Sequence, residues 1–202
     1  MARNLDLSLK QQLVEKCLAA VLQHGLADMS LRNLAAEVGT SARMLVYHFG
    51  SAEALFVEII KAFSRQEKLH FQALLENHEA GQTVGEFFQR YWHSFLADNY
   101  QPIFTLLFEL YARCLRDQET YAFFFDDVLR EWLALTEQVL RDRYGVTADA
   151  PAWATVIVSM SRGLLLDWLA SGETERIRQT IAVFETMLDH AMPVRAAGRP
   201  AD

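Results

Sequence analysis

Apolar residues recur three or four positions apart along most of the chain, the spacing that places them on one face of an α-helix. Glycines and short polar stretches separate the segments that carry this pattern. The pattern predicts helices over residues 8–24, 31–38, 42–49, 51–77, 83–98, 102–115, 120–144, 151–170 and 173–192. We therefore expect an all-α protein of about nine helices.

The second and third predicted helices are short and enclose a tight turn. Gly39 lies between them, where the chain needs a residue that accepts a positive φ. Ala35 is small enough to let the helices approach, and Leu45 is positioned to fill the angle between them. On spacing alone, this is either a helix-turn-helix or an ordinary αα-corner in a helical core. The expected N-caps of these helices and the next one are Ser30, Thr40 or Ser41, and Ser51.

Composition is ordinary for a globular protein with a sizeable core, since 51% of the 202 residues are hydrophobic and 22% are charged. The formal net charge of −7 is unevenly divided, because residues 1–50 carry +1 and the remainder carries −8. The acidity therefore belongs to the C-terminal part, which leaves the few N-terminal cations available to an anionic partner. The segment 193–202 is rich in Ala, Gly and Pro, and we expect it to be a disordered tail.

Several classes of protein do not fit the sequence. Cys17 and Cys114 are too few for a disulfide framework, and the six His show no metal-ligand spacing, so we expect neither a metal site nor a cofactor. Catalytic residue types do not cluster at motif spacing and no Gly-rich phosphate loop occurs, which argues against an enzyme. No apolar run reaches membrane-spanning length and the first ten residues lack a secretory pattern, so we expect a cytoplasmic protein with no membrane partner.

One segment carries several motif elements in order, namely a Ser-capped helix with an aliphatic-Ala pair, a Gly-x-Ser turn and a Tyr-His-Phe ending. It reads Ser30-Leu-Arg-Asn-Leu-Ala-Ala-Glu-Val-Gly39-Thr-Ser-Ala-Arg-Met-Leu-Val-Tyr-His-Phe49-Gly-Ser-Ala-Glu-Ala-Leu55. With the apolar helix before it, residues 8–60 resemble the DNA-binding domain of the TetR family of transcriptional regulators. The resemblance implies a three-helix DNA-binding domain over residues 1–50 and a helical effector-binding and dimerisation domain over residues 51–192.

In a helix-turn-helix, the exposed N-terminal residues of the second helix contact the bases. Arg43 suits a bidentate pair with guanine, whereas Ala42 and Met44 suit a thymine methyl group. A solvated charge at Arg43 and packing of Tyr47 and His48 against the following helix remain open alternatives. The candidate DNA contacts are Arg32, Thr40, Ser41, Ala42, Arg43, Met44, Tyr47 and His48.

Two positions depart from the family pattern. The family usually has Tyr where this chain has Val46, and Lys where it has Ala52. Both of the usual side chains contact phosphate, so their replacement predicts weaker backbone anchoring. The remaining anchors would include the N-terminus of the helix that begins after Ser51, because its amides favour an anion.

Residues 83–135 are dense in aromatic side chains, which either fill a helical core or line an apolar cavity between helices. The resemblance implies an effector pocket in this region. The candidate pocket residues are Phe88, Trp92, Phe95, Phe104, Phe108, Tyr111, Phe124 and Trp132. Candidate polar contacts are His93, Asn99, Glu109 and Arg113, although Glu109 and Arg113 are also spaced to pair with each other on a helix surface.

The last two predicted helices carry more apolar residues than one neighbour would cover. The segment from Ser161 to Leu165 resembles the family's penultimate helix, which pairs with its symmetry mate, and this implies a homodimer. The alternative is that both helices only close the core of one chain. The candidate interface residues are Val156, Met160, Leu164, Trp168, Ile177, Ile181, Phe184 and Leu188.

The function that follows from the resemblance is repression. The chain would bind double-stranded operator DNA and be released by a small apolar or aromatic effector, with the helix over residues 51–77 transmitting the change. Two alternatives stay open, a regulator or activator without a small-molecule inducer, and a partner-binding adaptor with a weakened DNA-binding head.

Overall fold

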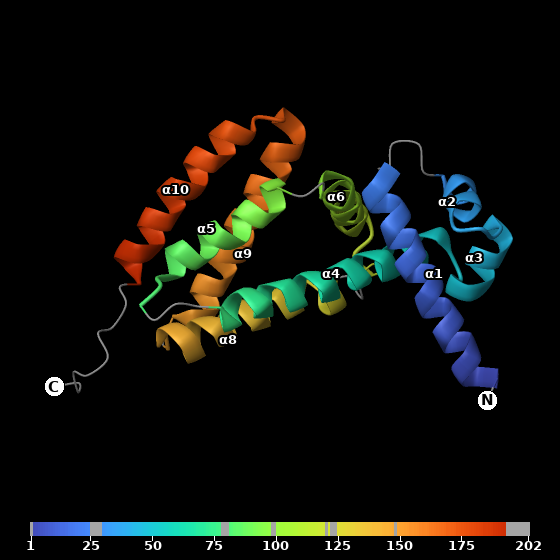
Figure 1. Cartoon of the computed structure of the whole chain (residues 1–202), viewed down its shortest axis with the longest axis horizontal. Coiled ribbons are helices and arrows are strands. Elements are labelled where there is room, and N and C mark those ends of the chain that lie inside the picture. The colour runs from blue at the N-terminus through green and yellow to red at the C-terminus, as the bar shows by residue number, and fades with distance from the viewer. Residues whose placement is uncertain are drawn as a thin grey trace. The chain divides into compact units, whose positions relative to one another are not determined.

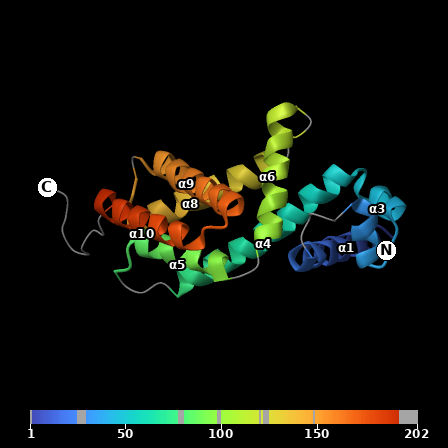
Figure 2. The same cartoon turned by 90° about the horizontal axis from the view of Figure 1, so that it is seen from above.

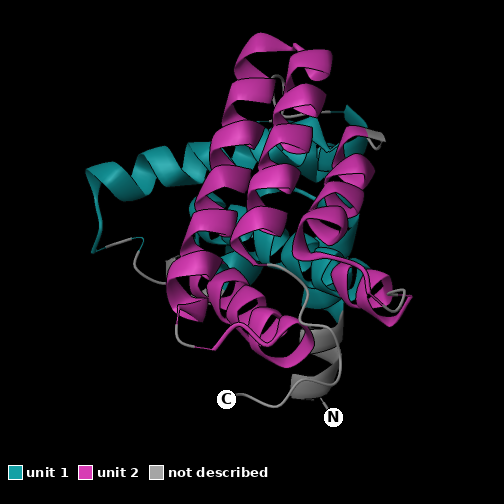
Figure 3. Cartoon of the chain, turned by 90° about the vertical axis from the view of Figure 1, so that its left-hand side faces the viewer, with its two compact units in different colours: residues 1–70, 99–128 teal, residues 71–98, 129–202 magenta. Residues whose placement is uncertain are grey.

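The computed structural model describes residues 2–24, 30–77, 81–97, 100–119, 121, 125–147 and 149–192. Within these ranges every regular element is helical and none is a strand, which confirms the all-α prediction. The chain forms two compact units (Figure 3), unit 1 with residues 1–70 and 99–128, and unit 2 with residues 71–98 and 129–202. Gly25, Asn99, Phe124 and the predicted tail over 193–202 lie outside the described residues.

The helices follow one another in the order that Figure 1 labels. Those of unit 1 are α1 (Ala2–His24), α2 (Leu31–Glu37), α3 (Ala42–Phe49) and α6 (Gln101–Arg116). Those of unit 2 are α5 (Val84–Ala97), α8 (Arg130–Tyr144), α9 (Ala150–Ser171) and α10 (Thr174–Ala191). The remaining two are α4 (Ala52–Glu76), which contributes residues to both units, and the π-helical turn η1 (Phe125–Leu129).

Most predicted helix boundaries agree with the structure to within a residue or two, and α3 begins and ends where the sequence predicts. The first helix is longer than expected, because α1 already begins at Ala2. The helix predicted over 120–144 is wrong in its first part, since η1 precedes α8 there. A π-helical turn shifts the hydrogen-bond register by one residue without a distinct sequence signal.

Unit 1 contains the helix-turn-helix segment and the helices that support it. In this unit α1 packs against both α2 and α6. Phe63 of α4 lies edge-on to Tyr100 and Phe104, with ring centroids 5.3 and 5.6 Å apart. Side chains with almost no exposed surface form the core: Cys17, Leu18, Val21, Leu34, Leu45, Leu55, Ile59, Ile103, Leu106 and Leu110.

Unit 2 is built from two helix pairs, α5 with α10 and α8 with α9, which lie side by side in Figures 1 and 2. At the start of α5, Thr83 and Glu86 form a reciprocal capping box, with N···O distances of 2.9 and 3.0 Å. Between these two residues, the Gly85 N–H donates to the Asp189 carboxylate of α10 over 2.9 Å. This contact brings the α5 backbone against α10.

The compact units do not follow the predicted division at residue 50, because α4 residues up to 70 and all of α6 belong to the same unit as α1–α3. The division into DNA-binding and effector-binding domains is a functional one, and it stays a prediction. No helix in the described ranges is long and apolar enough to cross a membrane.

Candidate nucleic-acid interface

The turn between α2 and α3 is held by two caps and a glycine. The Ser30 hydroxyl accepts from Asn33 N–H over 3.2 Å at the start of α2. At its end, Gly39 has a φ of 74°, and the amides of Gly39 and Thr40 donate to the carbonyls of Ala36 and Ala35 over 3.1 and 2.8 Å. This is the Schellman arrangement, which needs a left-handed residue and therefore favours glycine.

The cap of α3 is Ser41 rather than Thr40. The Ser41 hydroxyl accepts from Met44 N–H over 3.2 Å, with Ser41 itself in an extended conformation. Helices α2 and α3 pack against each other, and Leu34, Ala35 and Leu45 are almost completely buried, as the sequence predicts. The rotation of α3 about its own axis is thereby fixed.

The outer face of α3 carries Arg43, Met44, Val46 and Tyr47, all exposed. Tyr47 is 76% exposed and cannot be packed against the following helix, which removes one of the two alternatives for this residue. His48 is half-buried, and its ring meets the edge of Tyr47 at 5.2 Å between centroids. On the inner side, Lys10 of α1 lies 5.1 Å from the ring centre of Phe49.

The other candidate contacts lie around this face. Arg32 is exposed in the first turn of α2, Ser41 is exposed at the cap, and Thr40 and Ala42 are half-buried beside it. The structure therefore gathers the eight residues predicted to contact DNA on the helix-turn-helix segment. Whether they contact DNA stays a prediction.

The N-terminus of α4 follows this segment directly. The Ser51 hydroxyl accepts from Ala54 N–H over 3.1 Å, as predicted, and Ala52 contributes no charge. Glu53 accepts from Arg113 of α6 over 3.0 Å. A hydrogen bond from its own backbone amide, and then Arg113, lower the pKa of the Glu53 carboxyl. Arg113 pairs with Glu53 here, whereas the sequence offered Glu109 as its partner.

The predicted pocket residues are divided between the two units. Phe88, Trp92 and Phe95 are buried and Trp132 is half-buried in unit 2, while Phe104 is buried and Phe108 and Tyr111 are half-buried in unit 1. In unit 2, Phe71 meets Phe87, Tyr91 and Trp132 edge-on at 5.0, 5.0 and 6.0 Å. These contacts fit a packed aromatic core as well as a pocket wall, so the effector pocket stays a prediction.

The predicted dimer contacts stay a prediction, and within one protomer they differ in exposure. Six of the eight are buried within one protomer, although two of them, Phe184 and Leu188, also line the groove described below: Leu164, Trp168, Ile177, Ile181, Phe184 and Leu188. Met160 is half-buried and Val156 is exposed. The apolar residues of α9 and α10 that face outward are instead Val156, Leu166, Val183 and Met187.

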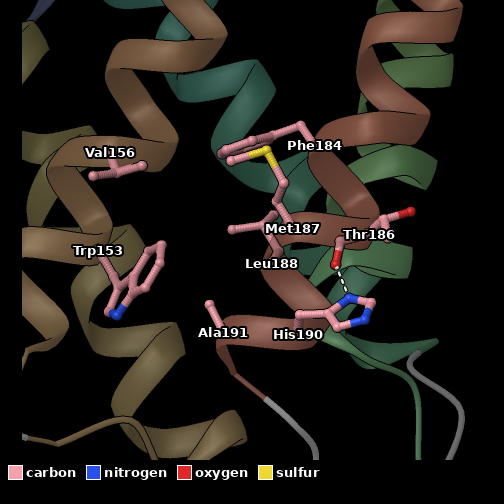
Figure 4. Close-up of a pocket in the computed structure, with 8 residues that line it drawn as sticks. All are labelled: Trp153, Val156, Phe184, Thr186, Met187, Leu188, His190 and Ala191. Atoms are coloured by element: carbon pink, nitrogen blue, oxygen red, sulfur yellow. Dashed lines mark hydrogen bonds between the residues drawn. The ribbon is translucent and has the colours of Figure 1, made fainter.

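An apolar groove of about 460 Å³ lies on these two helices (Figure 4). Trp153 and Val156 of α9 face Met187 and Ala191 of α10 across it. At one edge, His190 Nδ1 lies 2.7 Å from the Thr186 carbonyl oxygen. Sequence reasoning missed Trp153, Val183 and Met187, although the second apolar stripe on the last helix was a signal for the latter two.

In the part of the chain that the structure describes, no three His, Cys, Asp or Glu residues gather in a way that would hold a metal ion.

Residues 18–59, which contain α2 and α3, the end of α1 and the start of α4, match the model of the bacterial regulatory proteins of the tetR family. No curated protein sequence matches the chain.

Solved structures share the fold over almost the whole length. A protein described as a transcriptional regulator from Pseudomonas aeruginosa is 23% identical, with a TM-score of 0.67 over 91% of this chain and 89% of its own. A TetR-family regulator from Mesorhizobium loti is 16% identical, with a TM-score of 0.66 over 92% and 97%. The multidrug binding protein EbrR, in complex with imidazole, is 22% identical, with a TM-score of 0.59 over 93% and 97%.

Proposed function

We propose that this chain, whose residues 18–59 match the tetR-family model, is a DNA-binding transcriptional regulator of the TetR family, and that it represses its target genes until a small apolar or aromatic effector releases it. The observation that carries the proposal is the outer face of α3, where Arg43, Met44 and Tyr47 stand exposed on the second helix of the helix-turn-helix. Members of this family are DNA-binding proteins rather than enzymes.

The proposed operator contact places α3 in the major groove. An α-helix with its side chains is about 10–12 Å in diameter, which matches the width of that groove, about 12 Å. Arg43 would donate two hydrogen bonds to one guanine, while Arg32 and the hydroxyls of Thr40 and Ser41 would contact phosphates. Binding of an operator repeat needs two such heads, which is the reason to expect a homodimer.

The outward apolar residues of α9 and α10 support this dimer. Val183 and Met187 are 61% and 57% exposed on successive turns of α10, and Met187 lines the groove together with Trp153 and Val156 of α9. Large apolar side chains that are exposed together mark an interaction surface. A second copy of the chain would bury both stripes in an isologous helix-on-helix interface.

The effector part of the proposal rests on fold and composition. The aromatic residues of α5, α6 and α8 give both units an apolar interior, and EbrR, which shares the fold, is a multidrug binding protein. The proposed mechanism is linkage, in which operator DNA stabilises one spacing of the two heads and effector stabilises another. Helix α4 supplies residues to both units, so a change at one end can reach the other.

Selection of bound fragments from genomic DNA, including the promoter region of its own gene, tests this function. We expect saturable, salt-sensitive binding of the purified protein to particular fragments. Arg43→Ala should lower the preference for those fragments over competitor DNA by about tenfold or more, because a bidentate guanine contact is lost. Arg116→Ala, which removes the same charge from an exposed position at the end of α6, is the matched control and should bind like the wild type.

The same fragments then test release. Operator affinity measured against a panel of apolar and aromatic compounds should fall for at least one of them, and indifference to all would leave a regulator without a small-molecule inducer. If no fragment is selected at any salt concentration, operator binding is wrong. The partner-binding adaptor would then become the favoured function, since Val46 and Ala52 leave this DNA-binding segment without two of the family's phosphate contacts.

A further inference from the structure

The buried side of α3 determines what its outer face offers to DNA. Leu45 and Phe49, one turn apart, are 0% and 7% exposed and point into unit 1. Tyr47 lies on the opposite side of the helix, midway between them in sequence, and is the most exposed large apolar residue of this segment. Arg43 stands one turn before Tyr47 on the same ridge, and Met44 stands beside it.

The centre of this face is mostly carbon. Met44 is 42% exposed and ends in a thioether, and the ring of Tyr47 presents a broad apolar surface with one hydroxyl at its tip. Arg43 supplies the only formal charge among the exposed residues of α3. If carbon groups covered a base edge that carries only hydrogen-bond donors and acceptors, these donors and acceptors would lose their partners. Burying unpaired polar groups in this way costs free energy.

In the major groove, thymine presents an apolar group, its C5-methyl, beside a single acceptor. We propose that α3 recognises thymine through this methyl group, with Met44 and Tyr47 as the specificity-determining residues; the inference rests on the operator binding proposed above. In this arrangement Tyr47 contacts a base rather than a phosphate. Val46, at the side of this face, would contact the sugar-phosphate backbone without forming a hydrogen bond.

Replacement of thymine by deoxyuridine tests the inference directly, because it removes the methyl group and leaves base pairing unchanged. Synthetic duplexes of one selected fragment carry a single replacement at each thymine in turn. For at least one thymine in each half-site, wild-type affinity should fall about fourfold, the factor expected for exposing one buried methyl group. Uracil at positions outside the half-sites should have no effect.

Variants assign the contact to its residues. With Met44→Ala or Tyr47→Ala, the affinity difference between thymine and uracil should disappear at one of the sensitive positions, since the group that contacts the methyl is gone. Tyr47→Phe keeps the ring and should keep the difference. Leu69→Ala, at an exposed apolar residue of α4, is the matched control and should behave as wild type.

Each other outcome points elsewhere. Equal affinity for thymine and uracil at every position, with selective binding retained, overturns methyl recognition while operator binding stands. A uniform loss of affinity on Tyr47→Phe, equal to that of Tyr47→Ala, makes Tyr47 a phosphate anchor and overturns its part of the proposal. Failure to select any fragment overturns the proposed function itself.

Discussion

Cys17 is a single residue whose ionisation makes the stability of the protein depend on pH. Its side chain is fully buried in α1, and burial raises the pKa of the thiol from its ordinary value of 9.0 to about 11. A buried thiol of this kind is a small apolar core residue rather than a reactive group. Ionising this thiol in the folded protein therefore costs free energy, and this cost enters the free energy of unfolding.

This raised pKa predicts a loss of stability at alkaline pH. Below its ordinary pKa the thiol is protonated in both states and contributes nothing to the pH dependence. Between about pH 9 and pH 11 the unfolded chain releases the proton while the folded protein retains it, so the free energy of unfolding falls as pH rises.

Urea unfolding of wild type and Cys17→Ala at about pH 8 and about pH 10.5 measures the effect. The wild type should lose about 2 kcal/mol more than the variant between these values. The difference between the two proteins at about pH 8 gives the stability that the variant loses through the cavity that the substitution creates, and the change at about pH 10.5 is measured relative to it. Identical pH dependence in the two proteins would show that Cys17 ionises as readily in the folded state as in the unfolded chain.

At the scale of the element, the approach of α5 to α10 depends on a glycine inside a helix. A Cβ built on Gly85 would lie 2.5 Å from both the backbone carbonyl oxygen of Glu185 and the Asp189 carboxylate. Backbone at that distance cannot move aside as a flexible side chain can. Gly85 therefore permits the contact that its own amide makes with Asp189.

Gly85→Ala should separate these helices. Although alanine favours a helix, we expect the free energy of unfolding to fall by about 1–3 kcal/mol, the usual cost of inserting a methyl group into a packed contact. Gly163→Ala, in a helical position with open space around the added carbon, is the control and should be neutral or stabilising. A Gly85→Ala protein that unfolds at the same urea concentration as wild type would contradict this packing.

At the scale of the whole molecule, the proposed recognition of an operator would require two chains, and the outward residues of α9 and α10 are the surface proposed for their association. Val183 and Met187 belong to a stripe next to the one that Ile177, Ile181 and Phe184 bury in the protomer. Helix α10 therefore has one apolar side buried in its own core and another that is exposed and, in the proposed dimer, would contact the partner.

Val183→Glu should dissociate the dimer. A carboxylate enclosed in an apolar interface without a cation has no compensation for its lost hydration, so the dimer dissociation constant should rise by about two orders of magnitude or more. Sedimentation equilibrium measures this, with Leu69→Glu as the control at an equally exposed apolar position of α4. A wild type that sediments as a monomer, or a Val183→Glu protein of unchanged mass, would contradict the interface.

The sequence by itself determined most of the helices, because their signals are local. Ser30 and Ser51 cap the helices that they precede, and Gly39 ends α2 with the left-handed conformation that its turn requires. The buried contact of Leu45 with the preceding helix followed from spacing within one short segment. Caps, turns and helical periodicity act over a few residues, so a single sequence displays them.

The tertiary structure decided which of several suitable residues faces which neighbour. It paired Arg113 with Glu53, sixty positions earlier in the chain, and it exposed Tyr47. It also turned the stripe with Ile177 into the protomer and left Val183 outside. Periodicity marks both apolar stripes of a helix alike, and only the packing of elements distant in sequence determines which stripe the protein's own core covers.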